Sequence, residues 1–170
     1  MESRVKFFGH PVHPMLIVLP AGLFISTVIM DILYLVFHNP VFSTVAFYMM
    51  IIGVIGGLLA AIFGFIDWSG LPSNSRARNI GLWHGLGNFI IVVLFGASWF
   101  LRRGSPNFVP SGLALTLSFA GILLALMTLW IGGELVYRLG VAVDRGANVN
   151  APSSLKQSSA VNTKERTMNR

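Results

Sequence analysis

The chain alternates between long apolar runs and short polar segments. The apolar runs cover about residues 14–37, 45–66, 80–101 and 112–136. Each is close to the roughly 17–25 residues that a helix needs to cross a bilayer. Because the membrane interior offers the backbone no hydrogen-bonding partner, such runs predict helices. We therefore predict an all-α fold, a polytopic membrane protein whose four transmembrane helices form an antiparallel bundle.

The segments between the runs carry turn signals. They read HNPVFS, DWSGLPSNSRARN and RRGSPNFVPSG, and clusters of proline, glycine, asparagine and serine are typical of loops. Residues 1–13 form a polar N-terminal segment before the membrane domain, which spans residues 14–138. Residues 139–170 are polar and poor in aromatic side chains, a composition that predicts a disordered tail.

Composition supports the membrane class and narrows the chemistry. Hydrophobic residues make up 54% of the chain and charged residues 11%, whereas about a quarter of a soluble domain is charged. The sequence contains no cysteine, which excludes disulfides, thiolate nucleophiles and cysteine-ligated zinc or iron–sulfur sites. The net charge is +6, but the basic residues do not form a face in which aromatic side chains lie between them. We therefore expect lipid, and not nucleic acid, as the partner.

The basic residues predict an orientation. Ten of the 12 lysines and arginines lie in the N-terminal segment, the middle loop or the tail, and the other two are Arg102 and Arg103. The positive-inside rule then places both termini in the cytoplasm, with the protein in a bacterial inner membrane. The first apolar run follows Arg4 and Lys6, as the apolar part of a signal peptide follows its basic region. It is long and lacks a small-residue cleavage site, so we expect it to be retained.

Two histidines stand directly before the first run, in the sequence HPVHP. A residue that precedes proline favours extended or polyproline conformation, which predicts His10 and His13 on one edge, roughly 9 Å apart. Pro14 then suits the first helical position and His13 the N-cap. There the helix dipole favours a neutral imidazole, which is the form that a metal or haem iron binds.

An antiparallel bundle brings a further histidine to the same end. His84 lies about one turn into the third run, and Gly85 and Asn88 accompany it, so we expect its side chain to face the bundle interior. One interpretation is a b-type haem bound by His13 and His84, with His10 as the substitute ligand. The other is that these histidines cap helices and satisfy interior hydrogen bonds.

Two carboxylates at this end allow a different kind of site. Asp67 closes the second run and Glu134 the fourth. The alternative to haem is a metal or ion site made of His10, His13, Asp67, His84 and Glu134. The other interpretation of these carboxylates, which their place at the membrane surface favours, is structural ion pairing with Arg76, Arg78 or Arg138. A structural or assembly subunit without chemistry is the third interpretation.

The remaining polar and small residues carry weaker signals. Asp31 lies roughly 25 Å along the first helix at 1.5 Å per residue, so we expect it to form a solvated rim with His38. Gly53 and Gly57 give the second helix a GxxxG spacing, which predicts close helix packing, within the chain or in an oligomer. No catalytic motif is present in the sequence, so we predict no catalytic residue.

Four stretches resemble a known family. GHPVHPMLIVLPAGLFISTVIMD, GFIDW, WHGLGN and GGELVYRLGVAV span residues 9–143 and are similar to a bacterial membrane family known as domain of unknown function 2231. The resemblance implies a four-helix membrane protein. Because some members are joined to a Rieske-type iron–sulfur domain, it also implies redox surroundings and a redox partner protein. Members often have histidine after LVYR, where this chain has Leu139, so a ligand at that position would be absent here.

Overall fold

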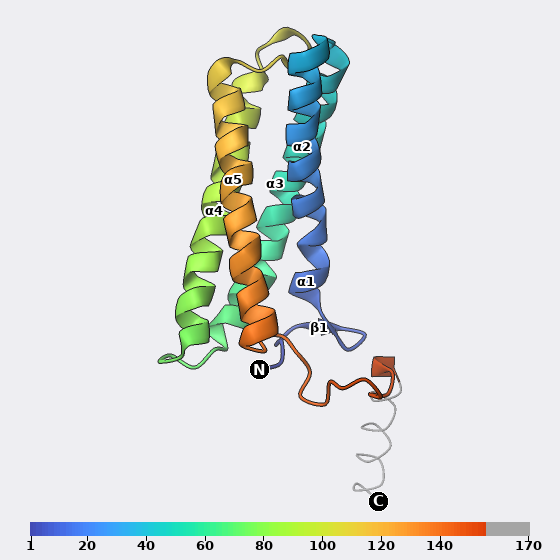
Figure 1. Ribbon diagram of the computed structural model, residues 1–170, viewed down its shortest axis with the longest axis vertical. Coiled ribbons are helices and arrows are strands. Elements are labelled where there is room, and N and C mark those ends of the chain that lie inside the picture. The colour runs from blue at the N-terminus through green and yellow to red at the C-terminus, as the bar shows by residue number, and fades with distance from the viewer. Residues whose placement is uncertain (156–170) are drawn as a thin grey trace, which may run out of the picture.

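The computed structural model describes residues 1–155 and is a bundle of long helices (Figure 1). The elements are α1 Val12–Leu16, α2 Val18–Phe37, α3 Pro40–Ser69, α4 Arg76–Arg102 and α5 Gly112–Gly133, with a π-helical turn over Glu134–Arg138 and a short 3-10 turn over Pro106–Phe108. Within residues 1–155, four helical stretches are long and apolar enough to cross a membrane. The predicted all-α membrane bundle is confirmed.

Helices α3 and α4 begin several residues before the predicted apolar runs because polar residues cap them, whereas α5 begins at Gly112 as predicted. Asn39 accepts a hydrogen bond from the Val41 N–H, Ser75 from Arg78 and Ser111 from Ala114. Such caps satisfy amide groups that the first turn leaves unpaired. Hydropathy alone therefore places the first residues of α3 and α4 too far inside the helices.

The N-terminal segment folds into a small hairpin in which β1 (Lys6–Phe7) pairs with β2 (His10–Pro11). Helix α1 begins directly afterwards, with Pro11 as its N-cap. The predicted extended conformation and N-cap position of His13 are therefore wrong, because His13 already lies in the first helical turn. Pro14 is compatible with this turn, since the amide that it lacks has no intrahelical partner there.

The predicted tail begins with an ordered stretch. The N-terminal amine of Met1 donates to Gly140 O over 2.8 Å, and the Ala142 N–H donates to Met1 O over 2.7 Å. These bonds hold the chain after α5 against the N-terminus, contrary to the predicted disorder from residue 139 onward. Residues 156–170 of the predicted tail lie outside the described residues.

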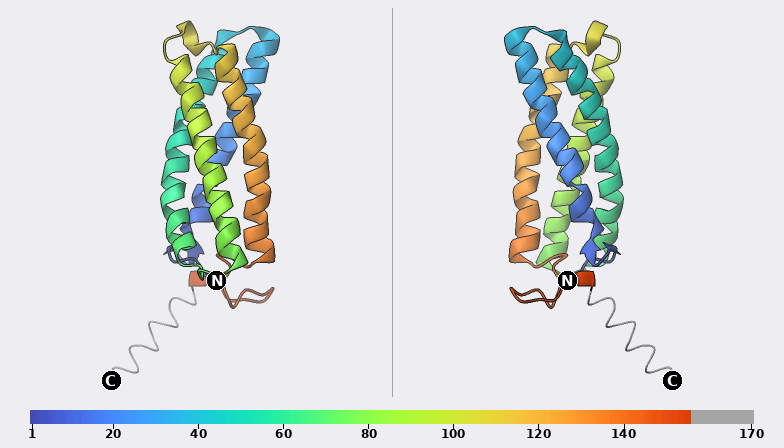
Figure 2. Two further views of the ribbon diagram at one scale, coloured as in Figure 1. Left: turned by 90° about the vertical axis from the view of Figure 1, so that its left-hand side faces the viewer. Right: turned by 90° about the vertical axis from the view of Figure 1, so that its right-hand side faces the viewer.

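The long helices form two hairpins, α2 (continuing α1) with α3 and α4 with α5, in which α2 and α4 run in the same direction (Figures 1 and 2). Matching residues of the hairpins meet in the core. Phe24 and Phe95 stack with ring centroids 4.1 Å apart, and Asp31 binds Arg102. Asp31 and Arg102 are 71 residues apart in the sequence, and so are Phe24 and Phe95. This constant spacing indicates an approximate two-fold axis along the bundle, as in membrane proteins built from parallel repeats.

Glycines make the same contact in both hairpins. A Cβ added to Gly53 on α3 would lie 2.8 Å from the Phe24 ring, and one added to Gly121 on α5 would lie 2.8 Å from the Phe95 ring. A Cβ at Gly57 would lie 2.9 Å from Val92. The glycine face that could have formed an oligomer contact therefore packs within the chain.

Candidate functional site

The first of the two predicted haem ligands, His13, binds the backbone of α3. Its Nδ1 lies 2.9 Å from Ala60 O. Because a carbonyl oxygen can only accept, Nδ1 carries the proton and Nε2 keeps its lone pair. A Cβ at Gly64 would come within 2.8 Å of the His13 Cε1 atom. The ring can reach the carbonyl because position 64 has no side chain.

The second, His84 on α4, makes the same kind of contact with the backbone of α5. Its Nδ1 lies 3.0 Å from Thr128 O, and a Cβ at Gly132 would come within 3.0 Å of the ring. The carbonyl and the glycine again stand one helical turn apart. One difference is that the Asn88 side-chain nitrogen, Nδ2, lies 3.2 Å from His84 Nε2. Asn88 Nδ2 also donates to His84 O over 2.8 Å.

The two imidazoles occupy matching positions of the two hairpins. His13 and His84 have the same separation as Asp31 and Arg102, which is 71 residues. Both are half-buried. A ring whose Nδ1–H is bound to a carbonyl and whose Nε2 holds the lone pair has the orientation typical of metal-ligating histidines.

Asp67 has a different role from the predicted arginine pairing. Its carboxylate accepts a hydrogen bond from Ser3 Oγ over 2.8 Å and another from the Arg4 N–H over 2.8 Å. The prediction that an arginine side chain pairs with Asp67 is wrong, because the N-terminal segment folds back and supplies the donors. Asp67 therefore fixes the N-terminal segment across the end of α3.

A surface cluster at this end also fixes the N-terminal segment. The hydrogen bond from Lys6 lowers the pKa of the Glu2 carboxyl, and the Arg145 N–H adds to this effect. A carboxylate with a lowered pKa stabilises the fold above its ordinary pKa, and that contribution is lost as the pH falls through the lowered value. The Glu2 contacts are therefore present at neutral pH.

The remaining predicted ligands do not join the histidine pair. His10 is exposed on β2, 3.4 Å from Ser154 Oγ. Glu134 pairs with Arg76 at 2.7 Å and with Arg138 at 3.8 Å, as its predicted structural role requires. Within residues 1–155, no group of three or more histidine, aspartate or glutamate side chains could hold a metal ion. His13 and His84 thus occupy matching positions, and the five predicted metal ligands do not form one site within residues 1–155.

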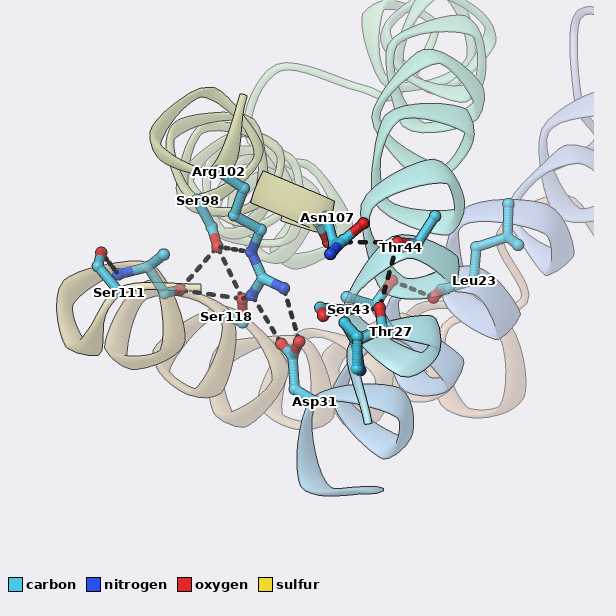
Figure 3. Close-up of polar contacts among 12 residues, drawn as sticks. Leu23, Thr27, Asp31, Ser43, Thr44, Ser98, Arg102, Asn107, Ser111 and Ser118 are labelled. Atoms are coloured by element: carbon cyan, nitrogen blue, oxygen red, sulfur yellow. Dashed lines mark hydrogen bonds and ion pairs between the residues drawn. The ribbon is translucent and has the colours of Figure 1, made fainter. Parts of the chain in front are cut away.

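A second polar cluster lies at the opposite end of the bundle (Figure 3). Arg102 Nη1 donates to Asp31 Oδ1 over 2.6 Å and Nη2 donates to Asp31 Oδ2 over 2.8 Å. Arg102 also bonds to Ser98 Oγ and Ser118 Oγ. Both charged side chains are fully buried, so the predicted solvated rim of Asp31 and His38 is wrong.

The direction of helical side chains explains this burial. A Cα–Cβ bond in a helix tilts toward the helix N-terminus, so Arg102 at the end of α4 extends back into the bundle. His38 instead ends α2 with a positive φ of 53° and remains exposed. Sequence reasoning assigned Arg102 to a loop. The signal that could have paired it with Asp31 is their separation of 71 residues, which His13 and His84 share.

Comparison with known proteins supports the resemblance seen in the sequence. The family model described as a predicted membrane protein, DUF2231, matches residues 9–145. The chain belongs to the DUF2231 family. The matched span contains both imidazoles and the Asp31–Arg102 pair. No curated protein and no solved structure matches the chain.

In this DUF2231 protein, the space beside His13 can be tested with a valine at Gly64. Because a Cβ there would lie 2.8 Å from the His13 ring, Gly64→Val should move the ring off α3 and cost about 1–3 kcal/mol through overpacking. Thermal unfolding in detergent should then occur several degrees lower. Gly85→Val is the matched control, since nothing lies within 4 Å of a Cβ there. Equal melting temperatures for the two variants would contradict this contact.

Proposed function

We propose that His13 and His84 bind one b-type haem, which would make this protein a redox-associated membrane subunit that exchanges electrons with a partner protein. One observation supports the proposal above the others. Imidazoles at matching positions of the two hairpins both donate Nδ1–H to a backbone carbonyl, at 2.9 Å and 3.0 Å. That arrangement gives the neutral Nε2 donors that haem iron requires.

The chain's own residues fit this role. The carbonyls of Ala60 and Thr128 fix the two ring orientations, and glycines at positions 64 and 132 give the rings room. To bind a haem, His84 Nε2 would have to lose its 3.2 Å contact with the Asn88 amide, which would keep its 2.8 Å bond to His84 O. A bound haem would supply one-electron chemistry, and the protein would orient it and set its surroundings.

The experiment is an absorption spectrum of detergent-solubilised protein purified from haem-replete cells. We expect a Soret band and, after extraction into alkaline pyridine, about one b-type haem per chain, since one pair of imidazoles would hold one haem. A colourless preparation that also takes up no added haemin would reject the proposal.

A structural or assembly subunit is the second candidate, and the contacts of His84 favour it. Both ring nitrogens of His84 already have a partner, Thr128 O and the Asn88 amide. A satisfied interior histidine stabilises helix packing without any ligand. In that case His84→Ala would lower the unfolding temperature, and the wild-type spectrum would contain no cofactor for the variant to lose.

We further propose a bacterial inner membrane with both termini in the cytoplasm. The charge bias supports this orientation, and the burial of Arg102 against Asp31 strengthens it by hiding a charge at the opposite end. Because the chain has no cysteine, single cysteines can report the side. An impermeant maleimide should label Gly104→Cys in intact cells and leave Ser73→Cys unlabelled. The reverse pattern would invert the topology.

A further inference from the structure

Helix α5 carries a shallow, wide-open apolar groove on its own surface, near the end of the bundle that holds the N-terminus. Leu126, Met127, Trp130 and Ile131 line it. Trp130 is 73% exposed, so an aromatic side chain borders the groove on the outside of the bundle. Tryptophan at this depth is typical of the boundary between hydrocarbon and headgroups.

A charged cluster lies one turn beyond the groove. Arg76 from α4 and Arg138 share the carboxylate of Glu134, at 2.7 Å and 3.8 Å. The arginine side chains are 63% and 78% exposed, whereas the Glu134 side chain is 18% exposed. Two guanidinium groups against one carboxylate leave an excess positive charge, and their exposed N–H groups can bind phosphate oxygens in bidentate fashion.

The groove and the charged cluster form one continuous surface. Met127, Ile131, Glu134 and Arg138 follow each other at the three- and four-residue spacings that place side chains on one helix face. The other hairpin has no such cluster. Its positions matching Glu134 and Arg138, in the register that matches Ala60 with Thr128, are Ile66 and Gly70. The arginine cluster is therefore not part of the architecture that the hairpins share.

We propose that this surface binds one anionic phospholipid, with an acyl chain along the groove and the phosphate against Arg76 and Arg138. The excess positive charge favours an anionic headgroup, because a zwitterionic lipid would bring its own cation near the arginines. The neighbouring apolar groove favours a lipid over a free phosphate ion. The site is independent of the histidine pair and does not require haem.

Fluorescence quenching by brominated lipids tests the proposal in reconstituted protein. The probes are bilayers that contain chain-brominated phosphatidylglycerol or chain-brominated phosphatidylcholine at equal mole fraction. The signal of Trp130 is the difference between wild type and Trp130→Phe. We expect the phosphatidylglycerol to quench Trp130 more strongly, with a preference of roughly fivefold per arginine. Arg76→Gln with Arg138→Gln should abolish the preference, and Arg103→Gln at the opposite end should leave it unchanged.

A charge-adding variant provides the second measurement. Glu134→Gln removes the carboxylate that Arg76 and Arg138 share, so it should increase the preference for phosphatidylglycerol. Equal quenching by the two lipids in wild type would overturn the proposal. A preference that survives the double arginine variant, or that Glu134→Gln leaves unchanged, would also overturn it. Loss of the preference on adding millimolar inorganic phosphate at constant ionic strength would show an anion site and not a lipid site, and would overturn it too.

Discussion

Replacing His84 by alanine is expected to abolish the Soret band of the purified protein. A non-covalent b-type haem depends on its axial ligands, and His84 supplies one of the two proposed. His13→Ala should have the same effect, because the two rings stand at matching positions and make the same carbonyl contact, at 2.9 Å and 3.0 Å. We expect at least a tenfold loss of haem affinity for either variant.

Two further variants make this result specific. His10→Ala is the matched control, since His10 is exposed on the N-terminal hairpin, and it should retain the wild-type spectrum. Asn88→Ala removes the amide that lies 3.2 Å from His84 Nε2. Because that contact competes with a ligand, haem affinity should rise a few-fold. A Soret band that persists in both His13→Ala and His84→Ala would assign the haem to another site.

Breaking the buried ion pair is expected to have the largest effect on stability. Asp31→Ala leaves the Arg102 guanidinium buried without its carboxylate, which costs about 3–5 kcal/mol. The temperature of thermal unfolding in detergent should fall by roughly 10 °C or more. The matched control is Arg103→Met, because Arg103 is exposed in the same turn, and this variant should unfold within a few degrees of wild type.

The double variant separates a need for charge from a need for packing. Asp31→Leu with Arg102→Met removes both charges and keeps similar volume, so it should recover most of the stability that Asp31→Ala loses. The pair joins α2 to α4, one helix of each hairpin. If Asp31→Ala unfolds at the wild-type temperature, the pair is not buried as the structure shows. If the double variant is as unstable as Asp31→Ala, the ion pair itself is required.

The helices were predictable from sequence, and most side-chain partners were not. Apolar length fixes a membrane helix without reference to its neighbours, and alternating direction then places His13 and His84 at one end. The partner of Asp31 depends on which way Arg102 extends from the last turn of α4, which hydropathy does not encode. The partners of Asp67 depend on a fold-back of the N-terminal segment that has no periodic pattern.

The local error at His13 has a similar origin. The proline rule concerns the backbone preference of the residue before a proline. Here the β1–β2 hairpin ends at Pro11. Pro11 is the N-cap residue of α1, so His13 lies inside the helix. The repeat was readable in principle, because histidine, phenylalanine and charged positions recur at a separation of 71 residues. The stacking of Phe24 on Phe95 shows that this repeat relates the two helical hairpins.

A haemin titration of purified cofactor-free protein tests most directly whether His13 and His84 bind the same haem. We predict saturation at one haem per chain, with the optical and magnetic signature of six-coordinate low-spin iron bound by two imidazoles. That signature should be absent from both His13→Ala and His84→Ala. No saturable binding, or a low-spin species that forms equally well in both variants, would contradict a shared site.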